Sequence, residues 1–273
     1  MELKATTYDV DGAVATISLS RPARHNAWTG RMHTEYRQCL QQADDDEAVR
    51  AVVLTGDPEG GAFCVGGDAD ALAGHAERGG YDPGTGPDLA TPGYGIRPEF
   101  DADFAFQFGL RIPVIAAVNG SAAGVGLAAA CFADVTFVAE HARLTTAHGR
   151  LGLPAEYGLS WLLPRRVGLT RATDLLLTSR IFSGVEAAQW GLALEALPAD
   201  EVLDRATEYA RVLAREVAPS SLSVTRRQLY QDLHRDAAGS VHDANRLLDE
   251  MMAGPDYAEG VAAFRDRRPP DFS

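Results

Sequence analysis

Short, largely apolar runs recur along the first half of the chain, and they determine the kind of sheet that it can form. Residues 51–55, 114–118 and 134–139 are runs of this kind, and segments with helical spacing separate strand-like stretches. A strand with one face in water alternates apolar and polar residues, whereas a strand buried on both faces does not. The sequence therefore predicts an α/β fold whose sheet is covered on both sides.

Other periodic segments complete this outline. Ala15, Ile17 and Leu19 alternate with polar residues and predict a half-buried strand, and residues 143–145 predict a short one. Helical spacing begins after Thr29, a candidate N-cap, with apolar positions at Met32, Tyr36, Cys39, Leu40 and Ala43.

The C-terminal part of the chain has a different character. Strand signals stop after Pro198, and a helical stripe follows at Leu203, Ala206, Ala210, Leu213, Ala214 and Val217. Two or three more helices are expected up to Phe264. We therefore expect an α/β core at residues 1–198 and a helical region at 199–273, packed on the core or on a neighbouring subunit. Residues 74–98 hold seven glycines and four prolines, which predicts a flexible surface loop or lid.

Charge and cysteine content narrow the function classes. With 25 basic and 38 acidic residues the net charge is −13, which argues against a nucleic-acid partner because phosphates would be repelled. No run reaches the roughly 18 apolar residues of a membrane span, and the N-terminus lacks a signal-peptide pattern. Three widely spaced cysteines favour neither disulfides nor a metal site, and they fit the cytoplasm.

Two glycine-rich turns each follow a buried strand, at residues 60–68 and 119–126. Glycine lets backbone amides approach a ligand closely, and two such turns can supply one N–H donor each to a developing oxyanion. Tight turning and close helix packing explain each turn equally well. Neither turn is a Walker loop, and the second is not a dinucleotide fingerprint.

Five segments in order resemble the crotonase superfamily, also called the enoyl-CoA hydratase/isomerase family. They are residues 21–27, 62–68, 113–126, 161–168 and 260–269. The resemblance implies a crotonase spiral of ββα units with a C-terminal helical trimerisation region. It also implies an acyl-CoA thioester substrate, no metal or redox cofactor, and a homotrimer or dimer of trimers.

The same resemblance assigns roles to individual residues. The backbone amides of Gly67 and Val125 would bind the thioester carbonyl. The two glutamates that hydratases of the family use fall on Ala128 and His148, so neither is present. Glu156 matches a position where several isomerases of the family carry an aspartate. Implied contacts to coenzyme A lie at Arg24, Ala62, Cys64, Val65, Asp68 and Phe264, with the basic C-terminal run as a further candidate.

Several functions follow from this residue set. The preferred one is Δ3-to-Δ2 enoyl-CoA isomerisation with Glu156 as the acid–base group, because one carboxylate can take a proton from C2 and return it at C4. Hydration of a 2-enoyl-CoA through His148 and Glu156 comes second, and hydrolysis through the same pair third. A silent CoA-binding scaffold is the alternative of another class.

The structural alternatives for these residues stay open. Glu156 can instead form a surface salt bridge with Arg165 or Arg166, and His148 can be a hydrogen-bonded core residue. The aromatic run 104–108 predicts either an apolar acyl pocket or ordinary core packing.

Overall fold

The computed structural model describes residues 2–79, 100, 102 and 104–272. Its larger sheet has six strands in the order β1-β2-β3-β5-β7-β10. β1 and β2 form an antiparallel hairpin, and the remaining neighbours are parallel. Every residue of β3 and β5 is buried, as their continuous apolar sequences predict. The strands are β1 (Thr6–Asp11), β2 (Val14–Leu19), β3 (Ala51–Gly56), β5 (Val114–Val118), β7 (Val135–Ala139) and β10 (Glu195–Leu197).

A second sheet is built from the segments that follow the strands of the first. It contains β4 (Ala62–Cys64), β6 (Ser121–Ala123), β8 (Arg143–Thr145) and β9 (Phe182–Ser183), in that order. The chain passes from β3 to β4, from β5 to β6 and from β7 to β8, and β4, β6 and β8 are parallel neighbours. This repeated passage between two sheets confirms the expected crotonase spiral.

Helices cover the sheets and fill the connections between them. α1 (Gly30–Asp45) starts where the sequence predicts, and the Thr29 hydroxyl accepts a hydrogen bond from the Met32 amide. α7 (Val202–Glu216) packs on β3, β5 and β7 through its buried small apolar face. The others here are α2 (Ala69–Arg78), α3 (Val125–Cys131), α4 (Leu159–Val167), α5 (Leu169–Thr178) and α6 (Gly184–Gln189). Across the described residues, no helix combines the length and apolar character needed to cross a membrane.

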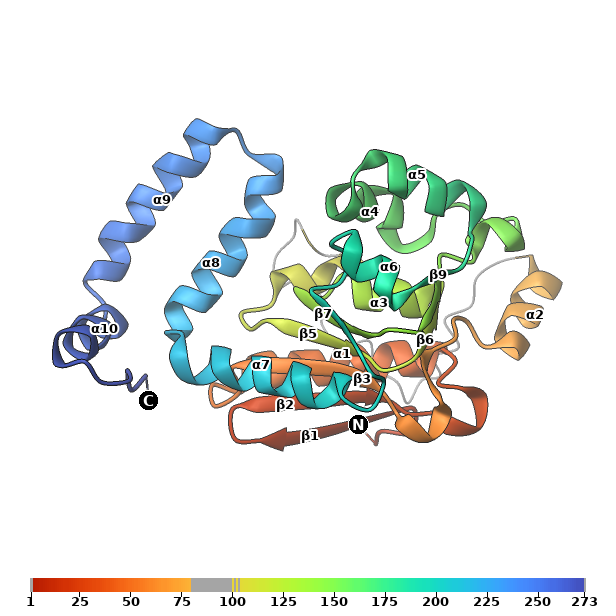
Figure 1. The fold of residues 1–273 in the computed structure, drawn as a ribbon, viewed down its shortest axis with the longest axis horizontal. Coiled ribbons are helices and arrows are strands. Elements are labelled where there is room, and N and C mark those ends of the chain that lie inside the picture. Colours follow the sequence, from red (N-terminus) through yellow and green to blue (C-terminus); the bar gives the residue numbers. More distant parts are fainter. Residues whose placement is uncertain (1, 80–99, 101, 103, 273) are drawn as a thin grey trace.

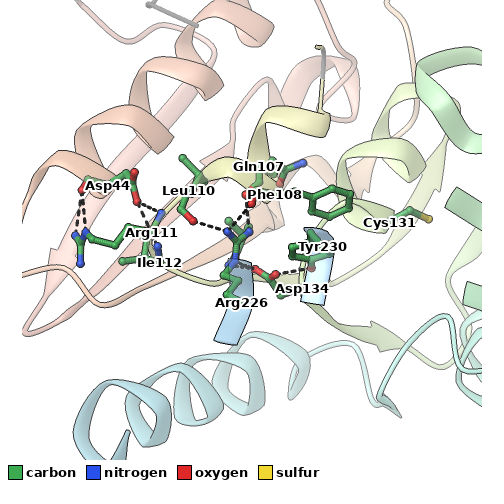
Figure 2. A network of polar contacts seen from close by, with 12 residues as sticks. Asp44, Gln107, Phe108, Leu110, Arg111, Ile112, Cys131, Asp134, Arg226 and Tyr230 are labelled. Atoms are coloured by element: carbon green, nitrogen blue, oxygen red, sulfur yellow. Dashed lines mark hydrogen bonds and ion pairs between the residues drawn. The ribbon is translucent and has the colours of Figure 1, made fainter. Parts of the chain in front are cut away.

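The last three helices extend away from the sheets as an arm (Figure 1). This C-terminal arm consists of α8 (Pro219–Gln231), α9 (Ala237–Met252) and α10 (Pro255–Asp266). A buried network joins it to the core (Figure 2): Arg226, 4% exposed, donates to Asp134 at 2.9 Å and to three main-chain carbonyls of residues 107–110. Tyr230 donates to the same carboxylate and stacks on Phe108 with ring centroids 3.8 Å apart.

One expected loop is partly helical. α2 continues through residues 74–78, and Gly79 ends it in the left-handed conformation at φ 67°, with its N–H bonded to the carbonyl of Ala76. The loop prediction was therefore wrong for these residues, because Gly79 serves as a helix C-cap. Residues 80–99 of that prediction lie outside the described part of the chain.

Candidate active site

Three segments of the site leave the same edge of the second sheet. Because β4, β6 and β8 are parallel neighbours, the turns that follow them lie side by side. Gly67 follows β4, Val125 follows β6 at the start of α3, and His148 follows β8. The backbone topology thus brings together residues that lie far apart in the sequence.

The two glycine-rich turns pack tightly against one another. A Cβ atom on Gly126 would lie 2.5 Å from the carbonyl oxygen of Cys64, and one on Gly66 would lie 3.1 Å from that of Ala123. Gly66 also has φ +100°, a conformation that L side chains rarely adopt. The packing interpretation of these glycines is therefore right, and the same close approach brings the two candidate donor amides together.

Both candidate amides point away from competing acceptors. Trp28 pairs with Gly67 in a parallel bridge: the Trp28 amide donates to Gly66 at 2.8 Å, and its carbonyl accepts from Asp68 at 2.9 Å. In such a bridge the N–H of the central residue, Gly67, faces the opposite side. Val125 is the first residue of α3, where a backbone N–H has no partner within the helix.

A cavity of about 980 Å³ lies in front of these amides, and Gly67, Val125 and Glu156 all line it. Apolar and aromatic side chains form much of its wall, including Trp28, Leu72, Leu151, Leu153 and Tyr157. The remaining lining residues are Lys4, Ala5, Arg21, Thr29, Gly30, Arg31, Asp68, Ala71, His75, Ala76 and Gly79.

Glu156 is a half-buried carboxyl group in this cavity. Burial raises its pKa above the ordinary 4.5, and the nearby charge of His148 lowers it in part. The expected alternative partners are engaged elsewhere: Arg165 donates to the Trp161 carbonyl, and Arg166 donates to the carbonyls of residues 131, 133 and 134. Among the described residues, no ion pair holds Glu156.

An aromatic cluster supports the segment that carries Glu156. Tyr157 adopts a left-handed backbone at φ 53° within the short 3-10 helix η6 (Glu156–Gly158). Its ring packs against the Phe104 ring in a T-shaped arrangement, with the two ring centroids 5.3 Å apart. The ring centroids of Phe104 and Trp28 lie 5.6 Å apart. The aromatic run 104–108 is thus core packing: none of its residues lines the cavity, and Phe104 packs behind two residues that do.

His148 lies in the core behind the cavity. Its side chain is buried, and Nε2 lies 3.1 Å from the carbonyl of Leu176, so this nitrogen carries the proton that is donated. It is not among the residues that line the cavity. Ala128 is fully buried on α3. Of the two positions where hydratases carry glutamate, neither presents a carboxylate here.

The implied CoA contacts are spread over the molecule. Asp68 lines the cavity, whereas Arg24 does not and instead pairs with Asp70. Ala62 and Cys64 are buried, Val65 is exposed, and burial raises the pKa of the Cys64 thiol to about 12, which makes it a poor nucleophile. Phe264 is 86% exposed on α10, in the C-terminal arm, and does not line this cavity.

Sequence reasoning missed several residues of the cavity. Trp28, Leu72, His75 and Tyr157 line it, yet none belongs to a spacing that identifies a ligand site. Two signals were available: Trp28 directly follows the 21–27 segment, and Tyr157 directly follows Glu156.

Known proteins are similar to this chain along nearly its whole length. The family model described as Enoyl-CoA hydratase/isomerase matches residues 9–273. The 1,2-epoxyphenylacetyl-CoA isomerase of Escherichia coli (strain K12) is 32% identical, over 97% of this chain and 96% of that protein. A probable enoyl-CoA hydratase of Rhodobacter capsulatus is 34% identical, over 100% and 99%. The crystal structure of a probable enoyl-CoA hydratase/isomerase from Mycobacterium abscessus has a TM-score of 0.84 and 35% identity, with 98% of each chain covered.

Proposed function

The chain belongs to the enoyl-CoA hydratase/isomerase family of enzymes, the crotonase superfamily, and from this premise we propose that it isomerises a Δ3-enoyl-CoA to the Δ2-enoyl-CoA. Glu156 is the single acid–base group in this proposal, and the amides of Gly67 and Val125 form the oxyanion hole. One observation carries it: Glu156 shares a cavity with both amides, whereas the other lining carboxylate, Asp68, is bound to Arg21 and caps α2.

The reaction is a proton shift along the acyl chain. The Glu156 carboxylate takes a proton from C2, and the electron pair moves onto the thioester oxygen to give a dienolate. The two amides stabilise that negative charge, and each such donor is typically worth about 3–4 kcal/mol of barrier. The protonated Glu156 then delivers its proton to C4, the C2–C3 double bond forms, and the thioester carbonyl is restored.

A raised pKa suits Glu156 to this double role. A carboxyl group with an ordinary pKa is a weak base and holds its proton briefly, whereas burial makes the carboxylate a stronger base. No electrons leave or enter the substrate, so the reaction requires no redox cofactor, and the two amides supply the charge stabilisation that a Lewis-acid metal ion would otherwise give. Coenzyme A takes part only as the thiol half of the substrate.

Hydration of a 2-enoyl-CoA is the second candidate. Two observations favour it: the charge of His148 acts on Glu156, and the similar protein of Rhodobacter capsulatus is named a probable enoyl-CoA hydratase. Hydration needs a second group to hold the attacking water. His148 is set behind the cavity with Nε2 committed to Leu176, so we prefer isomerisation.

We also propose that the chain assembles with copies of itself, as a trimer or a dimer of trimers. The C-terminal arm exposes large apolar side chains, which a monomer seldom leaves in water. They include Val241, Leu248, Met252, Tyr257 and Phe264. An apolar groove of about 550 Å³ runs between α8, α9 and α10. In a ring of three copies, the apolar side chains of one arm would contact a different surface of the next copy, so that each arm would be covered by its neighbour. A cytoplasmic location stays a prediction from cysteine content.

The experiment compares a 3-enoyl-CoA and a 2-enoyl-CoA of one chain length, with products separated by chromatography and weighed by mass spectrometry. We expect an isomer of unchanged mass from the 3-enoyl substrate. Glu156→Gln should remove it, and Glu201→Gln, a change at an exposed residue, should leave it intact. A product heavier by one water from the 2-enoyl substrate alone would favour hydration. Equal activity of wild type and Glu156→Gln would refute the assigned base.

A further inference from the structure

A partly buried ion pair, Arg21–Asp68, lies next to the oxyanion hole and is not used by the proposed chemistry. We infer that Arg21 and Asp68 are positioning residues that fix the peptide carrying the Gly67 amide. This inference rests on the proposed role of that amide as an oxyanion donor. Neither side chain is required to touch the reacting atoms.

The turn at residues 66–68 is held against one segment, residues 21–28. The parallel bridge between Trp28 and Gly67 supplies two backbone hydrogen bonds, at 2.8 and 2.9 Å. At the start of β4, before the turn, the buried Asn26 side chain donates a hydrogen bond to the Ala62 carbonyl at 2.8 Å. Residues 26–28 therefore contact the first glycine-rich turn both at its start, at Ala62, and at its end, at residues 66–68.

Arg21 joins the two sides of this bridge. Its Nη1 atom donates to the Ala27 carbonyl at 2.7 Å and to the Asp68 carboxylate at 2.9 Å. Ala27 immediately precedes Trp28, and Asp68 immediately follows Gly67. Arg21 Nη1 therefore links the two segments that the bridge pairs, because it binds the residue before Trp28 and the residue after Gly67.

Asp68 is fixed from the other side as well. Its second carboxylate oxygen accepts from the amides of Asp70 and Ala71 and so caps α2. Burial alone would raise the pKa of Asp68, but the Arg21 hydrogen bond and these amides outweigh it and hold the pKa below its usual value. Asp68 therefore stays ionised at neutral pH and keeps its bond to Arg21.

A neighbouring pair offers a contrast. Arg24 pairs with Asp70, but their side chains are 51% and 77% exposed, against 24% and 6% for Arg21 and Asp68. Arg24 Nε also lies 3.9 Å from Asp68 Oδ2, but Asp70 has no contact with Asp68 through its carboxylate, and exposed pairs contribute little to stability. Asp70→Asn is therefore a matched control for Asp68→Asn, two positions away on the same helix turn.

The kinetic test uses Asp68→Asn and Arg21→Gln on the 3-enoyl-CoA substrate. Asparagine still caps a helix, so the first change mainly removes the charge that binds Arg21. We expect kcat to fall roughly 100-fold, as for a displacement of about 1 Å in a reacting geometry. KM should stay within about threefold, since only transition-state binding is lost. The double variant should be no worse than either single one, and Asp70→Asn should match wild type.

Two further readouts separate positioning from general stability. The infrared carbonyl stretch of a bound, non-reacting acyl-CoA thioester moves to lower frequency when an oxyanion hole polarises it, and Asp68→Asn should reduce that shift. Amide hydrogen exchange at Trp28 and at position 68 should become at least about tenfold faster, with the β3 and β5 amides unchanged. The exchange measurement needs no substrate.

The outcomes are distinguishable. If no acyl-CoA is turned over by the wild type, the proposed function fails, and hydrogen exchange still decides whether the ion pair holds the bridge. Unchanged exchange at both amides in Asp68→Asn would overturn the inference. So would an unchanged kcat, or a loss of activity that Asp70→Asn reproduces.

Discussion

At the residue scale, the site divides its tasks between backbone and side chain. The oxyanion donors are amides, so the identity of the side chain at position 125 has little bearing on charge stabilisation. The acid–base task falls on one side chain, Glu156, whose surroundings shift its pKa in the direction that a base requires. Substitutions at these two kinds of position are therefore expected to behave differently.

The first prediction concerns the donor amide of Val125. Because proline is tolerated at the first position of a helix, Val125→Pro removes the N–H and leaves α3 able to form. We expect kcat to drop about 10²- to 10³-fold, the usual effect of losing one oxyanion donor. Val125→Ala keeps the amide and should stay within a few-fold of wild type. Steady-state kinetics with circular dichroism tests this, and an active proline variant would exclude Val125 as a donor.

The second prediction is the pH dependence of kcat/KM. The base must be ionised, and burial raises its pKa, so activity should fall as the pH drops through a value above the ordinary 4.5. His148 lowers that pKa in part. Removing its charge in His148→Gln should therefore move the acid limb to higher pH and leave the plateau within about tenfold. A pH–rate profile of both proteins measures this, and a folded His148→Gln variant that has lost hydration of the 2-enoyl-CoA at every pH would make His148 the catalytic partner of hydration.

At the element scale, the periodic elements could be predicted, whereas of the short strands only β8 was expected. The buried strands β3 and β5 and the helices α1 and α7 follow from apolar periodicity, because packing of one face or both dictates their residues. β4, β6 and β9 are two or three residues long, too short to carry a period. They form because neighbouring turns already bring their backbones together.

The candidate site was predictable to the extent that backbone topology builds it. The two glycine-rich turns predicted close backbone approach, but it was the resemblance to the family that assigned roles to Gly67, Val125 and Glu156. Trp28, Leu72 and Tyr157 belong to the cavity only because separate elements converge there, and no local pattern encodes that convergence. The burial of His148 depends likewise on its contact with α5.

The third prediction concerns how α8 is attached to the core. Arg226→Met removes a buried cation and leaves the carboxylate of Asp134 and main-chain carbonyls without this donor (Figure 2). Breaking a buried pair in this way typically costs about 3–5 kcal/mol. Chemical denaturation should show a loss of that size. Arg227→Met, the neighbouring residue on the same helix, is the control. A change below about 1 kcal/mol, the range of exposed pairs, would mean that the network does not hold α8.

At the scale of the whole molecule, the C-terminal arm is the part that the core does not cover. Its helices place apolar side chains in solvent, whereas the sheets and their covering helices form one continuous buried core. These exposed apolar side chains are the surface that the proposed self-association would cover.

The fourth prediction tests that assembly. Leu248→Glu puts a charge on the exposed apolar side of α9, and we expect it to convert trimers or hexamers into monomers in analytical ultracentrifugation. Asp249→Asn, also exposed on α9, should leave the assembly unchanged. A wild-type protein that sediments as a monomer at micromolar concentration would contradict the proposed self-association.

The most direct test of the central claim follows one proton. A 3-enoyl-CoA that carries deuterium at C2 is converted in ordinary water under single-turnover conditions, and the product is examined by deuterium NMR. If Glu156 carries the proton, part of the label should appear at C4 of the 2-enoyl product, less whatever the half-buried carboxyl exchanges with water, and Glu156→Gln should yield none. A Glu156→Gln variant that still moves the label to C4, or a product that has gained water, would contradict a single-base proton shift at Glu156.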